Sequence, residues 1–370
     1  MDDSRYDVIV VGAGAIGSAA GWWLARRGRR VLVFDQYEAG HVRGSSHGAS
    51  RIFRLGYAQP EYAEMALEAR VLWLELEEAS GERLLDPAGA VDYGPPGEVE
   101  PIRSVYEQCG VPYEMLDSGA AAGRWPGIRF DGDVLYQPDG ARIRADSVLR
   151  ALHDGIRQHG GDLRLGSGRA AVDVRDDGVH ARAPGVSGCA PVAVVAAGPW
   201  AAETLAGLVP LPPLTVTCEQ VAYFTPARPG LPWPCFIHRG EPSWYGLDTP
   251  GHGVKVGEHH MGKVVTADTR SFEVDPARQE RVAGFVRDWF PGLDPRPASS
   301  ETCLYTTTPS EDFVVDRRGR LVVAAGFSGH GFKFTPLIGR LLADEADGKS
   351  AAPAHLRLSR SGGPRRGGHL

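Results

Sequence analysis

Two short runs near the N-terminus are nearly all apolar, and a segment with helical spacing separates them. Residues 6–11 and 30–34 are rich in Val, Ile and Leu, which predicts strands buried on both faces of a parallel sheet. Residues 18–28 predict a helix with Ala19 and Trp23 on its apolar side. Short connections join the three segments, so they predict one strand–helix–strand unit of an α/β domain.

Similar patterns return along the chain. Residues 192–197 and 321–325 predict two more buried strands, and residues 162–174 predict a strand pair. Further helices are predicted over residues 58–80, 143–159, 276–290 and 333–347. In the first of these we expect the apolar face to consist of Leu67, Val71, Leu72, Leu74 and Leu76.

Between these segments lie stretches rich in Gly, Pro and short strand-like runs. The sequence therefore predicts an α/β fold in which a Rossmann-like domain is interrupted by a discontinuous α+β domain. We assign to the first domain residues 1–85, 141–212 and 306–350, and to the second residues 86–140 and 213–305.

Charge and composition limit the possible partners. The formal net charge is −6, which argues against a nucleic acid ligand, and no run of about 18 apolar residues predicts a membrane span. The polar, acidic first residues lead into a strand interrupted by glycines, which is not the layout of a signal peptide, so we expect a cytoplasmic protein. The five cysteines are widely spaced, so we expect neither a disulfide framework nor a zinc site. Residues 359–370 are rich in Gly and Arg and are expected to be disordered.

A glycine motif lies between the first strand and the first helix. Gly12 allows a tight turn, Gly14 lets the backbone approach a pyrophosphate, and Gly17 allows the helix and strand to pack closely. Asp35, at the end of the second strand, can accept hydrogen bonds from a ribose hydroxyl, which disfavours NADP. The segment predicts a dinucleotide site for FAD or NAD, with a plain glycine-rich turn as the alternative.

Two later segments combine small residues with charged ones. Residues 44–54 contain one histidine and two arginines among Gly, Ser and Ala, which suits the approach of a flat ring or an anion; a solvated surface loop is the alternative. Residues 326–334 follow a buried strand and open a helix. We therefore expect Lys333 at the carboxyl edge of the sheet, paired or directed at a ligand.

Lysine is scarce in this chain, with four of the 40 basic residues, so each lysine is informative. Lys255 lies in a predicted strand between Val254 and Val256 and should point away from both; an exposed strand face is the alternative. His259 and His260 follow, but no further ligand spacing supports a metal. Residues 302–309 by themselves indicate only a strand and a loop.

Together, the order and spacing of these segments resemble the monomeric sarcosine oxidase and N-methyltryptophan oxidase family of amine-oxidising flavoenzymes. The resemblance extends from the first strand to about residue 348. It implies an FAD-binding domain and a substrate domain whose large mixed sheet covers the flavin. It is carried by residues 7–17, 44–54, 124–126, 197–200, 253–259, 303–305 and 313–334.

The resemblance implies roles for individual residues. Cys303 matches the cysteine that joins FAD through a thioether to the flavin 8α-methyl group. Arg54 and Lys333 match the pair that holds the substrate carboxylate, which suits an arginine fork and a point charge. Lys255 matches the lysine that activates oxygen beside the flavin.

Other positions match groups around the flavin ring and the substrate. His47 and Arg51 match residues against the ring, with Arg51 stabilising the anionic reduced flavin. Phe236 falls where a flexible methionine lies over the substrate. Cavity-lining residues are matched by Tyr245, His259 and Tyr305, with His238, Arg239 and Trp244 as further candidates. The small-residue segments add the expected cofactor contacts Ser45, Ser46, Gly329 and Gly331.

We predict an FAD-dependent oxidase of the C–N bond of a secondary or cyclic amino acid, which gives an imine and H₂O₂; the imine is hydrolysed or retained. The expected partners are a small amino acid and O₂, with no metal, and we expect a monomer. One alternative is a biosynthetic imino-acid desaturase or a D-amino-acid or glycine oxidase-like flavoenzyme. Another is a flavin-binding protein without oxidase activity.

Overall fold

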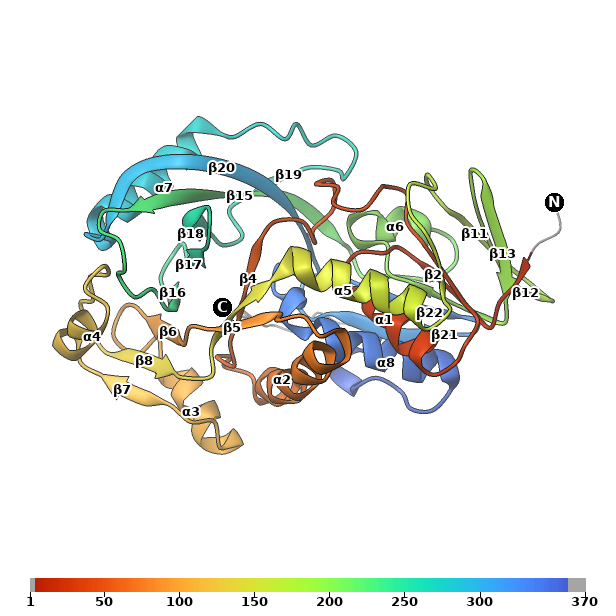
Figure 1. Ribbon diagram of the computed structural model, residues 1–370, viewed down its shortest axis with the longest axis horizontal. Coiled ribbons are helices and arrows are strands. Elements are labelled where there is room, and N and C mark those ends of the chain that lie inside the picture. Colours follow the sequence, from red (N-terminus) through yellow and green to blue (C-terminus); the bar gives the residue numbers. More distant parts are fainter. Residues whose placement is uncertain (1–3, 359–370) are drawn as a thin grey trace.

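The structure, a computed structural model, describes residues 4–358. Within this range the strands form four sheets, and the two largest lie in different halves of the molecule (Figure 1). The predicted tail, residues 359–370, lies outside the described residues.

The first large sheet has the Rossmann-like character that the sequence predicts. All neighbouring strands in it are parallel except β21 and β22. Its central strand β2 is buried at every residue, as expected for a continuous apolar run between two layers. Its six strands, in order, are β10 (Asp162–Arg164), β3 (Val31–Phe34), β2 (Val8–Val11), β14 (Val192–Val195), β22 (Leu321–Ala325) and β21 (Val314–Arg318).

Long helices pack beside this sheet. Helix α1 follows β2 directly and packs against both α5 and α8, while α2 packs against α8 (Figure 1). Their apolar faces form one core with the sheet. These helices are α1 (Ala15–Arg26), α2 (Pro60–Ser80), α5 (Ala145–Gln158) and α8 (Thr335–Asp347).

The second large sheet is mixed. Strands β15 and β20 pair along most of their length and curve across one end of the molecule, with α7 (Pro276–Trp289) packed on them (Figure 1). Strands β6 and β16 are its parallel pair. Its strands are β19 (Lys263–Val264), β15 (Thr215–Pro226), β18 (Gly253–Glu258), β17 (Trp244–Thr249), β16 (Cys235–His238), β6 (Ala90–Tyr93), β8 (Val134–Gln137), β7 (Glu114–Leu116) and β20 (Leu293–Thr307).

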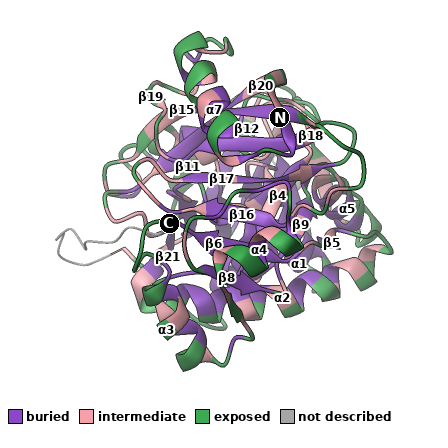
Figure 2. Cartoon of the chain, turned by 90° about the vertical axis from the view of Figure 1, so that its left-hand side faces the viewer, coloured by how far each residue is buried: buried purple, intermediate pink, exposed green. Residues whose placement is uncertain are grey.

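Two smaller sheets and short helices complete the fold. Figure 2 shows the strands as mostly buried, with exposed residues concentrated on helices such as α3 and α4. One sheet contains β1 (Ser4–Arg5), β13 (Val186–Ala190), β12 (Gly178–Ala183) and β11 (Ala171–Arg175), and the other contains β4 (Ser50–Phe53), β9 (Ala141–Arg144) and β5 (Leu85–Pro87). The remaining helices are α3 (Glu100–Cys109), α4 (Ser118–Arg124), α6 (Ala201–Thr204) and the 3₁₀ helices η1 (Gly198–Trp200), η2 (Gly331–Phe334) and η3 (Ala354–Leu356).

The predicted face of α2 is partly wrong. Val71 and Leu74 are 65% and 55% exposed, although we expected both to be buried. The helix instead buries a neighbouring stripe that includes Tyr62, Met65 and Trp73. That stripe contains aromatic and small residues at helical spacing, and its large rings fill the space against the helices beside it.

One strand pairing and one helix boundary also differ from the prediction. Residues 162–174 do not form a strand pair, because β10 joins β3 in the large sheet and β11 joins β12 in a smaller one. Ile143, expected to begin a helix, belongs to β9, and α5 starts at Ala145. Local sequence does not specify which sheet a short strand joins.

The sheets follow the predicted segments closely. The six-stranded sheet uses only segments assigned to the first domain, whereas β20 of the mixed sheet continues to Thr307, past the predicted boundary at residue 305. The α/β class with a mixed second sheet is confirmed, and the division into two domains stays a prediction. Among residues 4–358, no helix is both long and apolar enough to cross a membrane.

We expect Gly339→Ala to destabilise the fold. A Cβ at Gly339 in α8 would lie 2.4 Å from Ala19 Cβ and 2.6 Å from the Ala19 carbonyl carbon, so α1 and α8 must separate. The expected loss in the free energy of unfolding, measured with urea, is about 1–3 kcal/mol. The matched control is Gly284→Ala in α7, where a Cβ meets no atom within 4 Å, and a gain of about 0.5–1 kcal/mol is expected. Equal effects of the two substitutions would contradict the packing argument.

Candidate active site

One pocket extends from the glycine-rich turn after β2 to the strands of the mixed sheet. It brings together segments that lie more than 300 residues apart in the sequence. Of the predicted site residues, Gly17 does not line it. Those that do are Gly12, Gly14, Asp35, Ser45, Ser46, His47, Arg51, Arg54, Tyr245, Lys255, His259, Cys303, Tyr305, Gly329, Gly331 and Lys333.

At one end of the pocket, the glycine motif requires residues without side chains. Gly12 has a φ of 101°, and a Cβ there would lie 2.4 Å from the Ala196 carbonyl oxygen. A Cβ at Gly17 would lie 1.9 Å from the Gly12 carbonyl oxygen, so Gly17 lets α1 begin close to the turn. Gly14 is the N-cap of α1 and has no side chain of its own to cap the helix; the Ala15 N–H donates to Ser46 Oγ at 3.0 Å, and the other N–H groups of the first turn are available to a ligand.

The carboxylate of Asp35 fastens this turn. Its Oδ2 accepts the Ala13 N–H at 2.7 Å, and its Oδ1 accepts the Tyr37 N–H at 3.0 Å. Each carboxylate oxygen can accept a second hydrogen bond, so Asp35 keeps capacity for a ribose hydroxyl. A helix N-terminus for a pyrophosphate, an acid for a ribose and a sheet face for a ring fit an FAD molecule.

The small-residue loop before β4 is held by its own charged residues. Arg51 donates to the carbonyl oxygens of Ser45, His47 and Ser50, at 3.1, 2.5 and 2.8 Å respectively. His47 Nε2 lies 3.1 Å from the carbonyl oxygen of Thr302 on β20. Burial, together with the Arg51 charge, lowers the pKa of His47. The loop is therefore connected to the strand that carries Cys303.

Cys303 lies on β20 and Lys255 on β18, the strands that both pair with β15 in the mixed sheet. Burial raises the pKa of the Cys303 thiol to about 11. Lys255 Nζ donates to the Ser50 carbonyl oxygen at 3.1 Å and lies 3.8 Å from Glu301 Oε1. Burial and the Arg51 charge lower the pKa of Lys255 to about 8. Lys255 lines the pocket and points away from the core that contains Val254 and Val256, as strand alternation predicts.

Two buried cations lie at the other end of the pocket. Arg54 is 2% exposed and Lys333 is 6% exposed. Arg54 Cζ and Lys333 Nζ lie 5.2 and 5.1 Å from the centroid of the same ring, Tyr57. Lys333 Nζ donates to Tyr57 Oη at 2.7 Å, and burial with the nearby Arg54 charge holds the pKa of Lys333 well below its usual value.

Three polar rings stand close to this cation pair. Tyr305 Oη lies 3.4 Å from both Tyr245 Oη and His259 Nδ1. Burial, followed by the charge of His260, holds the pKa of His259 well below its usual value, so the imidazole is neutral. Gly329 has a φ of 78°, and a Cβ there would lie 2.3 Å from the Tyr305 ring, so glycine lets this turn approach the tyrosine.

The position that the resemblance gave Phe236, over the substrate, is wrong. Phe236 does not lie over the pocket: it is fully buried on the opposite face, with its ring centroid 4.8 Å from that of Phe290. Ile237 lines the pocket instead. His238, Arg239 and Trp244 also do not line it.

Three functional candidates were missed because their sequence signals are weak. Tyr57 lies three residues after Arg54 and gives no periodic pattern. Glu301 is two residues before Cys303, so strand alternation places both on one face. Asp92 is a charged residue in the fully buried strand β6. A charged side chain is rare in a buried strand, so this residue is a sequence signal for a buried ionic contact.

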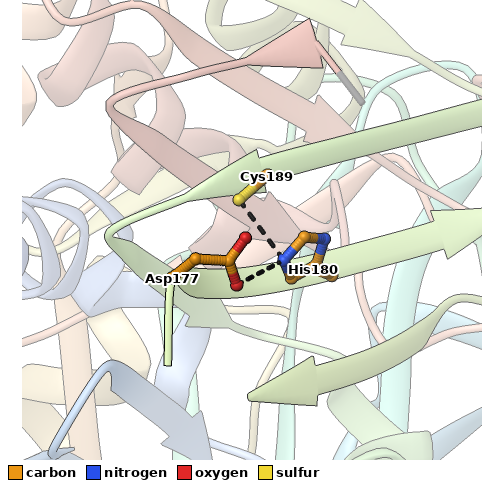
Figure 3. Close-up of side chains that lie close together, drawn as sticks. All are labelled: Asp177, His180 and Cys189. Atoms are coloured by element: carbon orange, nitrogen blue, oxygen red, sulfur yellow. Dashed lines mark hydrogen bonds and ion pairs between the residues drawn. The ribbon is translucent and has the colours of Figure 1, made fainter. Parts of the chain in front are cut away.

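One further cluster of possible metal ligands lies outside the pocket. His180 and Cys189 are directly paired across β12 and β13, and Asp177 lies in the adjoining turn (Figure 3). His180 Nε2 lies 3.0 Å from Asp177 Oδ1 and 3.6 Å from Cys189 Sγ. None of the three lines the pocket, so its chemistry does not involve them. The expectation of a metal-free protein stays a prediction.

Comparisons with known proteins agree with this arrangement. The family model described as FAD dependent oxidoreductase matches residues 7–345. The peroxisomal sarcosine oxidase of Homo sapiens is 35% identical over 357 residues, covering 91% of each chain. The monomeric sarcosine oxidase of Bacillus sp. (strain NS-129) is 30% identical over 364 residues, covering 93% of each chain. The predicted resemblance to this group is confirmed.

A solved structure has the same fold. It is NikD, described as an unusual amino acid oxidase essential for nikkomycin biosynthesis, with a TM-score of 0.86 and 29% identity over 96% of this chain and 97% of NikD. These relatives confirm the prediction of an FAD-dependent enzyme that oxidises amines or amino acids. The chain belongs to the FAD-dependent oxidoreductase family, within which it is similar to the sarcosine oxidases over nearly its whole length.

Proposed function

We propose that this enzyme oxidises the C–N bond of a secondary or cyclic amino acid whose carboxylate binds to Arg54 and Lys333. The observation that carries the proposal is the pair of buried cations beside Tyr57, both of which line the pocket. A substrate carboxylate there would be clamped by an arginine fork and a lysine point charge. This clamp would fix the orientation of the adjacent C–N bond.

The chain's own residues bind, orient and exclude water. When bound, FAD accepts a hydride equivalent from the substrate and passes the electrons to O₂, which gives an imine and H₂O₂. The amine must be neutral at that moment, because an ammonium group has no lone pair to assist the loss of hydride. His259, beside Tyr305, is neutral. It therefore neither protonates the amine nor adds a positive charge next to it.

Lys255 supplies a cation at the flavin end of the mixed sheet. Its Nζ is held by the Ser50 carbonyl and by nearby Glu301. These two groups therefore fix the position of the charge before any ligand binds. A fixed cation stabilises negative charge that develops as O₂ accepts electrons. We assign to Lys255 the role of accelerating the reaction of the reduced enzyme with O₂.

Cys303 is the proposed attachment point of FAD through a thioether. Such a bond would replace the Sγ hydrogen and one methyl hydrogen, with O₂ as the acceptor of the two electrons and two protons released. The partners are then a small amino acid and O₂, and the protein acts as a cytoplasmic monomer. The name of the monomeric sarcosine oxidase relative supports the monomer.

The first test is substrate oxidation by the purified enzyme. H₂O₂ release is measured with sarcosine, N-methyltryptophan, proline and pipecolate, with glycine and D-alanine as controls. Turnover of a secondary amino acid supports the proposal. Turnover of the primary amino acids alone would move the enzyme to the D-amino-acid or glycine oxidase type, and flavin that no amine reduces would indicate a binding protein. A cyclic product that keeps its imine would indicate a desaturase.

We expect Cys303→Ala to make FAD extractable. Acid precipitation of the unaltered protein should leave the flavin absorbance in the pellet, whereas the variant should release it into the supernatant. Cys218→Ala is the matched control, since Cys218 lies on the neighbouring strand β15 and does not line the pocket. Flavin in the supernatant of the unaltered protein would remove the role given to Cys303.

We expect Lys255→Met to slow oxidation of the reduced enzyme by O₂ about 100-fold, because a preorganised charge is lost. Anaerobic reduction by substrate should change far less, and stopped-flow absorbance measures both steps. Since lysine is charged below its pKa, the O₂ reaction should slow as pH rises through about 8, and only in the enzyme that keeps Lys255. Lys263→Met, at an exposed lysine, is the control. Equal slowing of both steps would contradict this role.

We expect Arg54→Met and Lys333→Ala to raise KM about 10- to 100-fold for a carboxylated substrate, through the loss of charged hydrogen bonds. For the decarboxylated counterpart of the same amine, the effect should be small. Steady-state kinetics with both compounds measures the difference. Lys349→Ala, at an exposed lysine paired with Asp347, is the control. Equal losses for both compounds would exclude the carboxylate clamp.

A further inference from the structure

A buried carboxylate lies behind the cation pair. Asp92, on β6, is 1% exposed and stands between Arg54 and Arg239, which follow β4 and β16 respectively. Arg239 is itself 6% exposed. Neither Asp92 nor Arg239 lines the pocket, whereas Arg54 does. Two arginines from different segments therefore share one carboxylate just outside the substrate region.

The two arginines contact Asp92 unequally. Arg239 donates to Asp92 Oδ1 from Nη2 at 2.8 Å and from Nε at 3.1 Å. Arg54 Nη1 lies 3.7 Å from the same oxygen, which is beyond hydrogen-bond distance. Buried Arg54 Nη1 has no hydrogen-bond partner among residues 4–358. The guanidinium of Arg54 is thus close to a negative charge but keeps uncommitted N–H groups.

We infer that Arg239 is a positioning residue, which engages Asp92 so that Arg54 remains available to the carboxylate of the substrate. The inference rests on the proposed function, in which Arg54 anchors the substrate. Asp92 balances the arginine charges inside the protein, and Arg239 prevents it from capturing Arg54.

The competing arrangement is close in space. A shift of about 0.8 Å would bring Arg54 Nη1 from 3.7 Å to an ordinary hydrogen-bond distance from Asp92. A Cβ at Gly56 would lie 2.7 Å from Arg54 Nη1 and 2.8 Å from Asp92 Oδ2, so both groups flank a residue without a side chain. A buried arginine and carboxylate without other partners pair strongly, since each is otherwise left desolvated. Removing Arg239 should therefore let Asp92 bind Arg54.

The test uses a ligand that requires the clamp but cannot be oxidised at a C–N bond. Methoxyacetate, the ether counterpart of sarcosine, is titrated into the FAD-loaded enzyme, and its Kd is read from the change in flavin absorbance. We expect Arg239→Gln to weaken binding about tenfold or more, in keeping with loss of charged hydrogen bonds. Arg239→Gln combined with Asp92→Asn should restore the Kd to within about threefold of the unaltered enzyme, since the competitor has lost its charge.

Substrate kinetics provide a second readout. Arg239→Gln should raise KM for a carboxylated amine much more than it lowers kcat, and the double variant should reverse that change. Arg278→Gln is the matched control, because Arg278 is a buried arginine between Glu219 and Glu258, outside the pocket. It should lower stability and leave the Kd unchanged. If Arg239→Gln does not fold, Arg239→Lys with and without Asp92→Asn replaces it.

The outcomes separate this inference from the proposed function. An unchanged Kd in Arg239→Gln, or a double variant as weak as the single one, would overturn the inference. In that case Arg54→Met would still weaken methoxyacetate binding if the clamp is correct. An unchanged Kd in Arg54→Met would instead overturn the clamp itself.

Discussion

The active site depends on positive charge that is kept out of water. A buried cation is stable only beside groups that accept its hydrogen bonds or balance its charge. Lys255 meets this requirement with the Ser50 carbonyl and the Glu301 carboxylate, and Lys333 meets it with the Tyr57 hydroxyl. These partners come from β4, from β20 and from the segment between β4 and α2. The charge of Lys255, on the mixed sheet, is therefore held in place by a group from a different sheet.

The two ends of the pocket offer a ligand different kinds of interaction. At the glycine end, the pocket offers uncharged backbone N–H groups at the start of α1, and small residues leave room for a close approach. At the other end, charged and aromatic side chains project from the strands of the mixed sheet and from the turn before α8. The first end suits the diphosphate and ribose common to many cofactors. The second end carries the cations to which we propose that the substrate carboxylate binds.

Strand alternation bears on both a success and an error of the sequence prediction. Val254 and Val256 are buried in the core on one face of β18, so Lys255 was correctly directed to the other. On β16 the resemblance, without an alternation argument, placed Phe236 over the substrate, whereas Ile237, on the opposite face of the strand, lines the pocket. A lone charged residue fixes the phase of a strand, whereas a uniformly apolar strand does not.

The amino-acid sequence by itself determined the α/β class, the glycine-rich turn with Asp35, and the family relationship, because these depend on local spacing and order along the chain. Only the tertiary structure decided how the cations are held. Tyr57 meets Lys333 across 276 residues, and Asp92 meets Arg239 across 147. Such contacts depend on strand register and on the packing of distant segments, which no local pattern encodes. The sequence specified which chemical groups are present, and the fold decided which of them remain free to act.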